Sequence, residues 1–305
     1  MIAMKEDTIT DPAPGSRLTI SHLLGIFSLS TALLLSVWDI RLSMIPLIFF
    51  VLISFIAPFF TGISYFLPII TRGKPSGKSV SLTFDDGPDP ISTPALLTLL
   101  AKKNIQATFF VTGKNASRHP DLIQDILRQG HTIGNHSYHH DPLIMLKSSK
   151  KLFQEIQRTQ DILKTYGIHT FAFRPPAGIT NPKLGKILSR LGMYCVNYSC
   201  RAFDMGNRRI PNLSGKILRK IQPGDIVLLH DIIPAKEKKQ RMLKWLIEIE
   251  GIVDGIRKKG LEVIPLPNLI HRPVMESIRN VTHASHHEHP ASEPWWKHSI
   301  FLTYL

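Results

Sequence analysis

Two long apolar stretches open the chain, over about residues 18–38 and 44–70. Each can span a bilayer, which needs about 20 mostly apolar residues. Asp39 and Arg41 lie in the short link between them, so residues 1–71 are expected to form a transmembrane helical hairpin. A cleaved signal peptide fits less well, because its apolar core is shorter and a cleavage site would follow it. Three prolines in the second stretch leave open a broken or re-entrant segment.

From residue 79 the pattern changes to short apolar runs that alternate with amphipathic segments. This alternation predicts a parallel sheet with helices outside it, and about seven strands favour closure into a barrel. Expected strands are 80–84, 107–111, 131–134, 171–174, 194–198, 225–229 and 261–265. Expected helices are 94–103, 121–129, 148–166, 182–191, 213–221 and 237–259. A catalytic domain is therefore expected over residues 79–270.

The flanks of this domain differ from it in composition. Residues 72–78, rich in Lys, Gly, Pro and Ser, predict a linker. Residues 271–305 lose the alternation and carry His283, His286, His287 and His289, which favours a flexible, solvated tail over a metal site. The aromatic residues close to the end of the tail suggest a contact with a membrane interface.

Charge is concentrated in the part of the chain after the apolar stretches. Residues 72–305 hold 34 basic and 19 acidic residues, a formal charge of +15. Basic residues flank both ends of the apolar region, so the positive-inside rule predicts a cytoplasmic catalytic domain at a bacterial inner membrane, with a periplasmic one as the alternative. Nucleic acid is not an expected partner, because no basic stripe interleaved with aromatic residues is present. The only cysteines, Cys195 and Cys200, are too close along one strand-like segment to form a disulfide.

Two adjacent acids, Asp85 and Asp86, end the first strand and run into Gly87 and Pro88. A turn alone would explain these residue types. Like charges at this spacing push their pKa values apart, and a metal at one acid would divide the pair into a ligand and a base. The motif by itself is consistent with either interpretation.

A histidine pair supports the catalytic interpretation. His136 and His140 follow the strand expected at 131–134 and are four residues apart, so one cation can take both imidazoles. Together with Asp86 they form a two-histidine, one-carboxylate set that fits zinc or another borderline transition metal. Arg174, Asp204 and His230 lie at or near further strand ends, where the loops of a β/α barrel converge.

The order and spacing of four motifs resemble the polysaccharide deacetylase family, the NodB-homology domain or carbohydrate esterase family 4. The motifs are Thr83–Pro88, His136–His140, Arg174–Gly178 and Leu228–Asp231, and the resemblance covers residues 78 to about 267. It implies a distorted (β/α)7 TIM-like barrel that removes acetyl groups from N-acetylated sugars with one divalent metal, commonly zinc, with cobalt as another fitting ion.

The resemblance also implies roles for individual residues. Asp86, His136 and His140 are expected to bind the metal, and Asp85 is expected to be the base. His230 is expected to donate a proton, with Asp204 supporting its ring, and Arg174 is expected to orient Asp85. The residues expected to bind the substrate are Ala177, Leu228 and Met205. Three positions depart from the family pattern: Met205, Ala177 and Arg201. These departures concern substrate binding, and Arg201 would suit a negatively charged substrate.

The leading functional interpretation is a membrane-attached, metal-dependent N-deacetylase of an acetylated amino sugar in a polysaccharide, an oligosaccharide or a lipid-linked sugar. An O-acetyl esterase would use the same metal and base but would need less protonation of its leaving group. A catalytically silent, membrane-attached glycan-binding protein is the alternative from another class, and the presence of Asp85, Asp86, His136, His140 and His230 disfavours it.

Overall fold

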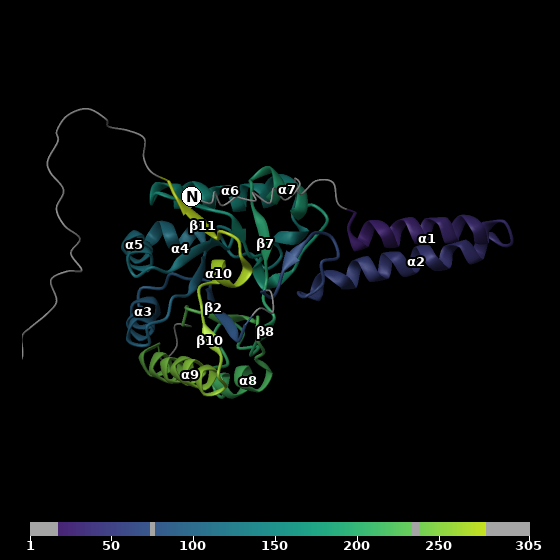
Figure 1. The fold of residues 1–305 in the computed structure, drawn as a ribbon. Coiled ribbons are helices and arrows are strands. Elements are labelled where there is room, and N and C mark those ends of the chain that lie inside the picture. The colour runs from purple at the N-terminus through teal and green to yellow at the C-terminus, as the bar shows by residue number, and fades with distance from the viewer. Residues whose placement is uncertain (1–17, 74–76, 234–237, 279–305) are drawn as a thin grey trace, which may run out of the picture.

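A curved parallel sheet forms the centre of the protein (Figure 1). The structure, a computed structural model, describes residues 18–73, 77–233 and 238–278. Along the sheet the strand order is β1-β7-β6-β4-β3-β2-β9-β8, and β10 pairs with the first residues of β2. The bounds are β1 Ile69–Ile70, β2 Ser79–Asp85, β3 Thr108–Val111, β4 Thr132–Asn135, β6 Ala172–Phe173, β7 Tyr194–Val196, β8 Cys200–Arg201, β9 Ile226–His230 and β10 Glu262–Val263.

The central strand is β2, which is buried along nearly its whole length. Every residue from Val80 to Asp85 is buried, as expected for a strand covered on both faces of a parallel sheet. The Thr83 hydroxyl is satisfied by donating to the carbonyl of Val227 in the neighbouring β9, at 2.7 Å. In the same register Asp85 lies opposite Phe110 on β3 and His230 on β9.

Helices cover the outside of the sheet (Figure 1). They bury apolar faces against it, and Trp245 on α9 is fully enclosed. Their bounds are α3 Ser92–Lys102, α4 Gly113–Arg118, α5 Pro120–Arg128, α6 Ser149–Thr165, α7 Leu184–Arg190, α8 Leu213–Lys220, α9 Lys238–Lys258 and α10 Leu266–Ile270.

The sheet is an α/β half-barrel that the segment 194–201 partly closes. Its first part, β7, pairs with β6, and its last part, β8, pairs with β9, so this segment connects two distant strands of the sheet. The seven expected strands correspond to β2, β3, β4, β6, β7, β9 and β10. The architecture is consistent with the expected (β/α)7 barrel, but β10 lies off the main strand order and β1 and β8 were not expected.

The first two helices lie side by side as a hairpin that projects from the half-barrel (Figure 1). They are α1, Ile20–Ser36, and α2, Ile40–Ile56, which continues as a short 3-10 turn, η1, Ala57–Phe59. The Asp39 carboxylate caps α2 by accepting from the N–H of Arg41 at 2.8 Å. Many apolar side chains face outward, Phe55 being 74% exposed. In the described chain only Ile40–Phe59 is long and apolar enough to cross a membrane, while α1 is shorter.

The expected boundary of the membrane region differs from the structure. The apolar stretch 44–70 was expected to be one membrane segment, yet its helix ends at Ile56 and its last residues join the half-barrel. Tyr65 and Leu67 are buried, and Ile69 pairs with Cys195 of β7. Hydropathy alone cannot separate apolar residues that face lipid from apolar residues that face a protein core.

The expected linker and tail also have structured parts. Gly73 donates a backbone hydrogen bond to Gly224, so the start of the linker 72–78 is joined to the domain. In the expected tail, 271–305, strand β11 (Met275–Ser277) pairs antiparallel with β5 (Ile168–Thr170). These two strands form a separate two-stranded sheet from residues far apart in the chain, and the local composition carried no signal for this pairing. The four tail histidines lie outside the described residues.

We predict that Leu67→Ala destabilises the whole domain, because Leu67 is 4% exposed and packs in the core with Leu184 and Met193. The expected loss in the free energy of unfolding is about 2–5 kcal/mol. Denaturant unfolding in a mild detergent measures it. Leu243→Ala, at a position that is 54% exposed, is the matched control with little effect. Equal stability of the two variants would show that residues 65–70 do not belong to the folded domain.

Candidate metal and catalytic site

The two adjacent acids occupy different backbone conformations. Asp85 is the last residue of β2 and is buried, whereas Asp86 has a φ of 79° and leaves the strand in the left-handed region. The Asp86 carbonyl is held by the side-chain amide of Asn115, which donates at 2.8 Å. At Gly87 a Cβ would collide with the Asp231 carboxylate, so only glycine fits. This turn directs the two carboxylates to different partners.

Asp86, His136 and His140 come together as one cluster. Oδ1 of Asp86 lies 3.1 Å from Nε2 of His140 and 3.5 Å from Nε2 of His136. One candidate ligand atom from each residue lies within 4.8 Å of the others. Ligands at about 2.1 Å around a tetrahedral zinc are roughly 3.4 Å apart, so these separations suit one ion. The cluster joins the ends of β2 and β4.

A second hydrogen bond orients His136 for this role. Its Nδ1 lies 2.7 Å from the Arg174 carbonyl, which can only accept, so Nδ1 donates. In the neutral ring, which is the form that binds a metal, Nε2 then presents its lone pair toward Asp86. Such an outer hydrogen bond fixes the tautomer and the ring orientation of a histidine ligand. For the neutral ring of His136 the tautomer is therefore the one with its proton on Nδ1, because the carbonyl oxygen of Arg174 cannot donate.

The residues present fit a divalent cation. Oδ1 of Asp86 is buried and accepts no hydrogen bond among the described residues. Burial opposes its ionisation, but the neighbouring imidazoles of His136, His140 and His230 lower the pKa of Asp86 well below its ordinary value. An ionised, buried oxygen beside two imidazole nitrogens is a donor set suited to zinc or a similar ion rather than calcium or magnesium.

Arg174 holds the other acid, Asp85, from inside the half-barrel. Its side chain is fully buried, and Nη1 donates to Oδ1 of Asp85 at 2.6 Å and to Oγ1 of Thr83 at 2.7 Å. Nη2 donates to the carbonyl of Asn197 at 3.0 Å. The second oxygen of Asp85 lies 3.7 Å from Nε2 of His136, on the side of the metal-ligand cluster. One carboxylate oxygen is therefore fixed and the other faces the cluster.

His230 and Asp204 form a second charged pair next to the acids. Nδ1 of His230 lies 2.8 Å from Oδ2 of Asp204. Burial lowers the pKa of His230, but the hydrogen bond to Asp204 and the negative charges of Asp204, Asp86 and Asp85 outweigh it and raise this pKa to about 9. At neutral pH the ring is an imidazolium whose Nδ1 donates to Asp204, which leaves Nε2–H to donate elsewhere. Asp85 and His230 thus provide an acceptor and a donor of protons on adjacent strands.

The three expected substrate-binding residues lie at this end of the sheet or on its loops. Ala177, in the 3-10 turn η3 (Pro176–Gly178), is exposed and has a φ of 57°. Its N–H donates no hydrogen bond within the described chain. Leu228 lies two residues before His230 on β9 and is 7% exposed. Met205 is 56% exposed, in a loop whose Gly206 lies beside Asp86.

Sequence reasoning gave no role to Asp231, which the structure places among the supporting residues. Its Oδ2 accepts from Oγ1 of Thr93 at 2.8 Å, and burial raises its pKa to about 7. It closes against Gly87 and so supports the turn that carries Asp86. The sequence did show that Asp231 is an acid directly after a buried strand. This places it at the same end of the sheet as the site, but it does not indicate that Thr93 and Gly87 are its neighbours.

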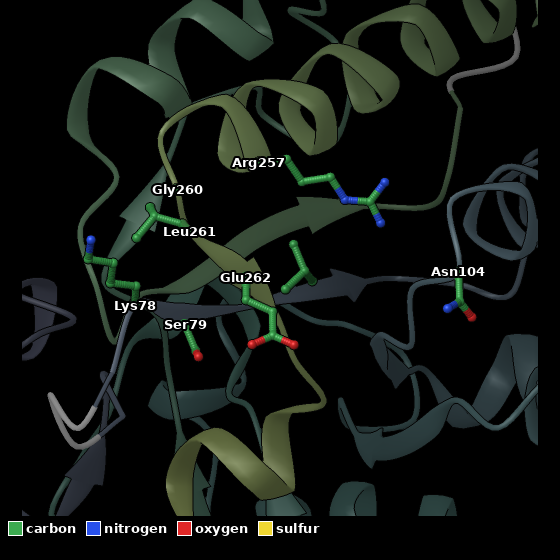
Figure 2. A pocket seen from close by; sticks show the side chains of 8 residues that line it. Lys78, Ser79, Asn104, Arg257, Gly260, Leu261 and Glu262 are labelled. Atoms are coloured by element: carbon green, nitrogen blue, oxygen red, sulfur yellow. The ribbon is translucent and has the colours of Figure 1, made fainter.

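A separate cavity of about 490 Å³ lies at the opposite end of β2, between Lys78, Ser79, Arg257 and Glu262 (Figure 2). Ser79 and Asp85 are the two ends of the strand, about 20 Å apart at 3.3 Å per residue. This cavity contains none of the residues of the metal-ligand cluster. It is therefore not the catalytic site.

Comparison with known proteins agrees with this geometry. Residues 72–196 match the family model described as polysaccharide deacetylase. The chain is 31% identical to a chitooligosaccharide deacetylase of Azorhizobium caulinodans, over 62% of this chain and 93% of the relative. It is 36% identical to a peptidoglycan-N-acetylglucosamine deacetylase of Bacillus cereus, over 63% of this chain and 88% of the relative.

Solved structures show the same fold. The Bc1960 peptidoglycan N-acetylglucosamine deacetylase matches with a TM-score of 0.61 and 27% identity, over 68% of this chain and 94% of that one. A family 4 carbohydrate esterase from Streptomyces lividans, in complex with acetate, matches with a TM-score of 0.54 and 30% identity, over 61% and 92% of the two chains. Fold and site define a hydrolase that acts on N-acetyl amide bonds. The chain belongs to the polysaccharide deacetylase family, carbohydrate esterase family 4.

We predict that Arg174→Gln lowers the free energy of unfolding by about 3–5 kcal/mol, because it leaves the buried Asp85 without its cationic partner. Chemical denaturation at neutral pH is the measurement. Arg158→Gln removes an exposed arginine that lies over the ring of Tyr138, and it should change the stability far less. A similar small effect for Arg174→Gln would mean that Asp85 does not depend on this ion pair.

The raised pKa of His230 gives stability a defined pH dependence. The folded-state value, about 9, exceeds the ordinary 6.5, so this stabilisation is complete below pH 6.5 and is lost as pH rises through about 9. Asp204→Asn should therefore destabilise the protein by about 1–3 kcal/mol at pH 6 and much less at pH 10. Thermal unfolding at pH 6 and at pH 10, in the presence of a chelator, measures the two losses of stability. Asp161→Asn, on the surface of α6, is the control, and an equal loss at both pH values would assign Asp204 a packing role.

Proposed function

We propose that this protein is a divalent-metal-dependent N-deacetylase of acetylated amino sugars of the N-acetylglucosamine type, with zinc as the expected ion and cobalt as an effective substitute. The carrying observation is the arrangement around Asp86, His136 and His140, where a fixed carboxylate and a protonated histidine lie beside one three-ligand site. The similar proteins are named for deacetylation of chitooligosaccharide and of peptidoglycan N-acetylglucosamine, which supports the same bond type for this chain.

The two proton carriers have complementary tasks. A bound divalent ion would supply Lewis acidity, which activates water and polarises the acetyl carbonyl. Asp85 accepts the proton of the attacking water, and Arg174 keeps its carboxylate oriented for that task. His230, protonated at neutral pH, donates its proton to the departing amine nitrogen. Asp204 holds the ring of His230 in place.

The acetyl group needs a donor and an apolar wall. The unpaired N–H of Ala177 is available to donate to the oxygen that becomes negative when water attacks. Leu228, on the same face of β9 as His230, would contact the acetyl methyl group. Met205, on the exposed loop beside Asp86, would contact the sugar. These three assignments place the acetamide between β9 and the turn at Ala177.

An O-acetyl esterase would use the same cluster, but the state of His230 favours the amide. An alcohol leaves as a weakly basic oxygen, whereas an amine nitrogen must gain a proton before the C–N bond breaks. The carboxylate of Asp204, 2.8 Å from Nδ1 of His230, favours the protonated ring and so suits the second need. A silent glycan-binding protein would need none of these charged groups in a fixed arrangement.

We further propose that the α1–α2 hairpin attaches the enzyme to a bacterial inner membrane with its catalytic domain in the cytoplasm. The outward apolar side chains of α2 support insertion, and the basic residues that flank the hairpin support this orientation. A cytoplasmic domain would meet oligosaccharide or lipid-linked precursors, and a periplasmic one would meet peptidoglycan or exopolysaccharide. Protease protection in intact spheroplasts distinguishes the two, since a cytoplasmic domain stays uncut until the membrane is opened.

The central test is product release from a defined N-acetylated chitooligosaccharide. We predict equal amounts of free amine and acetate, loss of activity with a chelator, and recovery with zinc or cobalt. Asp85→Asn should lower kcat at least about 100-fold without loss of metal binding, because it removes only the base. Asp86→Ala should lose both metal binding, measured by metal analysis after dialysis, and activity. Acetate without amine, from an O-acetylated sugar only, would falsify the N-deacetylase proposal, and full activity of Asp85→Asn would contradict its role.

A further inference from the structure

A second cavity, of about 480 Å³, lies where the helical hairpin meets the half-barrel. Phe59 and Phe60, at the end of the α2–η1 helix, form one side of it. Tyr198, Arg201 and Lys220 contribute from the half-barrel, the last at the end of α8. The lining contains two cations and no acidic residue. Its volume is in the range that accommodates a small ligand.

The two cations lie around one exposed aromatic ring. The guanidinium of Arg201 lies 3.9 Å from the ring centroid of Phe203, and Nζ of Lys220 lies 5.4 Å from it. Nη1 of Arg201 also donates to the hydroxyl of Tyr198 at 2.8 Å, which fixes the arginine in this position. Neither cation has a carboxylate partner in the described part of the chain. A fixed arginine with free N–H groups beside a lysine is a favourable site for a phosphate.

The other side of the cavity is apolar and continuous with the proposed membrane segment. Phe59 is 61% and Phe60 is 57% exposed. Phe59 ends, and Phe60 directly follows, the helix Ile40–Phe59, which among the described residues is the one long and apolar enough to span a bilayer. With α2 inserted, this end of the helix lies at the depth of the lipid phosphates. A ligand that satisfies both sides carries a phosphate and an apolar chain.

The cavity is also joined to the catalytic site through shared segments. The loop after Arg201 carries Asp204, the partner of His230, and Gly206, which lies beside Asp86. Five residues span at most about 18 Å, so Arg201 and Gly206 are within the length of a short glycan. On the other flank, Asn197 donates to the carbonyls of Thr61 and Gly178, both at 3.0 Å, which ties the end of the hairpin to the turn that carries Ala177.

We propose that this cavity binds the phosphate of the substrate itself, a lipid-phosphate-linked acetylated amino sugar. Arg201 and Lys220 bind the phosphate, Phe59 and Phe60 contact the start of the lipid chain, and the sugar extends past Met205 to the metal-ligand cluster. This inference rests on the proposed deacetylase function and adds the class of carrier. It explains why two cations that have no carboxylate partner among the described residues lie beside exposed aromatic residues at the base of the hairpin.

The test compares two substrates with the full-length enzyme in neutral phosphatidylcholine vesicles. One is N-acetylglucosamine 1-phosphate esterified to a long alkyl alcohol, and the other is soluble chitotetraose. We expect Arg201→Gln and Lys220→Gln each to lower the ratio of kcat/KM for the lipid phosphate to that for chitotetraose by about tenfold, mainly through KM. Lys216→Gln, the same charge change one turn earlier on α8, should leave the ratio within twofold. Melting curves confirm that each variant is folded.

Other outcomes overturn the inference separately from the proposed function. A ratio unchanged in both variants, or an equal loss with both substrates, would exclude a phosphate site. An unchanged ratio together with weaker binding of the variants to phosphatidylglycerol vesicles would likewise reject the substrate's phosphate as the ligand and would assign the cavity to a phospholipid headgroup. Wild-type activity on chitotetraose alone would reject the lipid carrier and keep the deacetylase. Activity on neither substrate would contradict the deacetylase proposal itself.

Discussion

The ion pair between Arg174 and Asp85 is the interaction around which the site is built. A guanidinium with no exposed surface is tolerated only because its donors reach Asp85, Thr83 and the carbonyl of Asn197 at once. Those partners come from β2 and from the segment after β7, so the arginine joins opposite parts of the half-barrel. The backbone carbonyl of Arg174 also accepts a hydrogen bond from His136, so the position of the arginine fixes the ring of His136 in the cluster with Asp86 and His140.

This arrangement explains how two neighbouring acids acquire different chemistry. Asp85 stays in the strand and meets a permanent cation, whereas the left-handed conformation of Asp86 turns its carboxylate toward two imidazoles. Two adjacent carboxylates repel each other, and this repulsion is offset because Asp85 pairs with Arg174 while Asp86 faces His136 and His140. His230 and Asp204 repeat the principle with opposite sign, since a buried carboxylate keeps the imidazole protonated.

The hairpin is more closely connected to the half-barrel than a flexible anchor would be. Strand β1 pairs with β7, and Asn197 contacts the end of the hairpin and the turn at Ala177. The side chain that supports the turn at Ala177 thus also contacts the segment that follows α2 and η1. A glycan attached to a lipid would reach the site along this route, which relates the basic cavity to the catalytic residues.

The sequence alone determined the alternation of strands and helices and predicted that Asp86, His136 and His140 lie together, because these depend on local periodicity and on residue types at strand ends. The family resemblance added Arg174 as the expected partner of Asp85 and Asp204 as that of His230, and both contacts are present. It did not indicate that the carbonyl of Arg174 would accept from His136. Tertiary structure decided that Ile69 and Ile70 belong to the sheet and not to a membrane segment, and that Met275 pairs with β5. It also decided that Arg201 and Lys220 share one cavity with Phe59. These contacts join residues far apart in the chain, and the local sequence around an apolar or basic residue does not indicate which distant residues will pack against it.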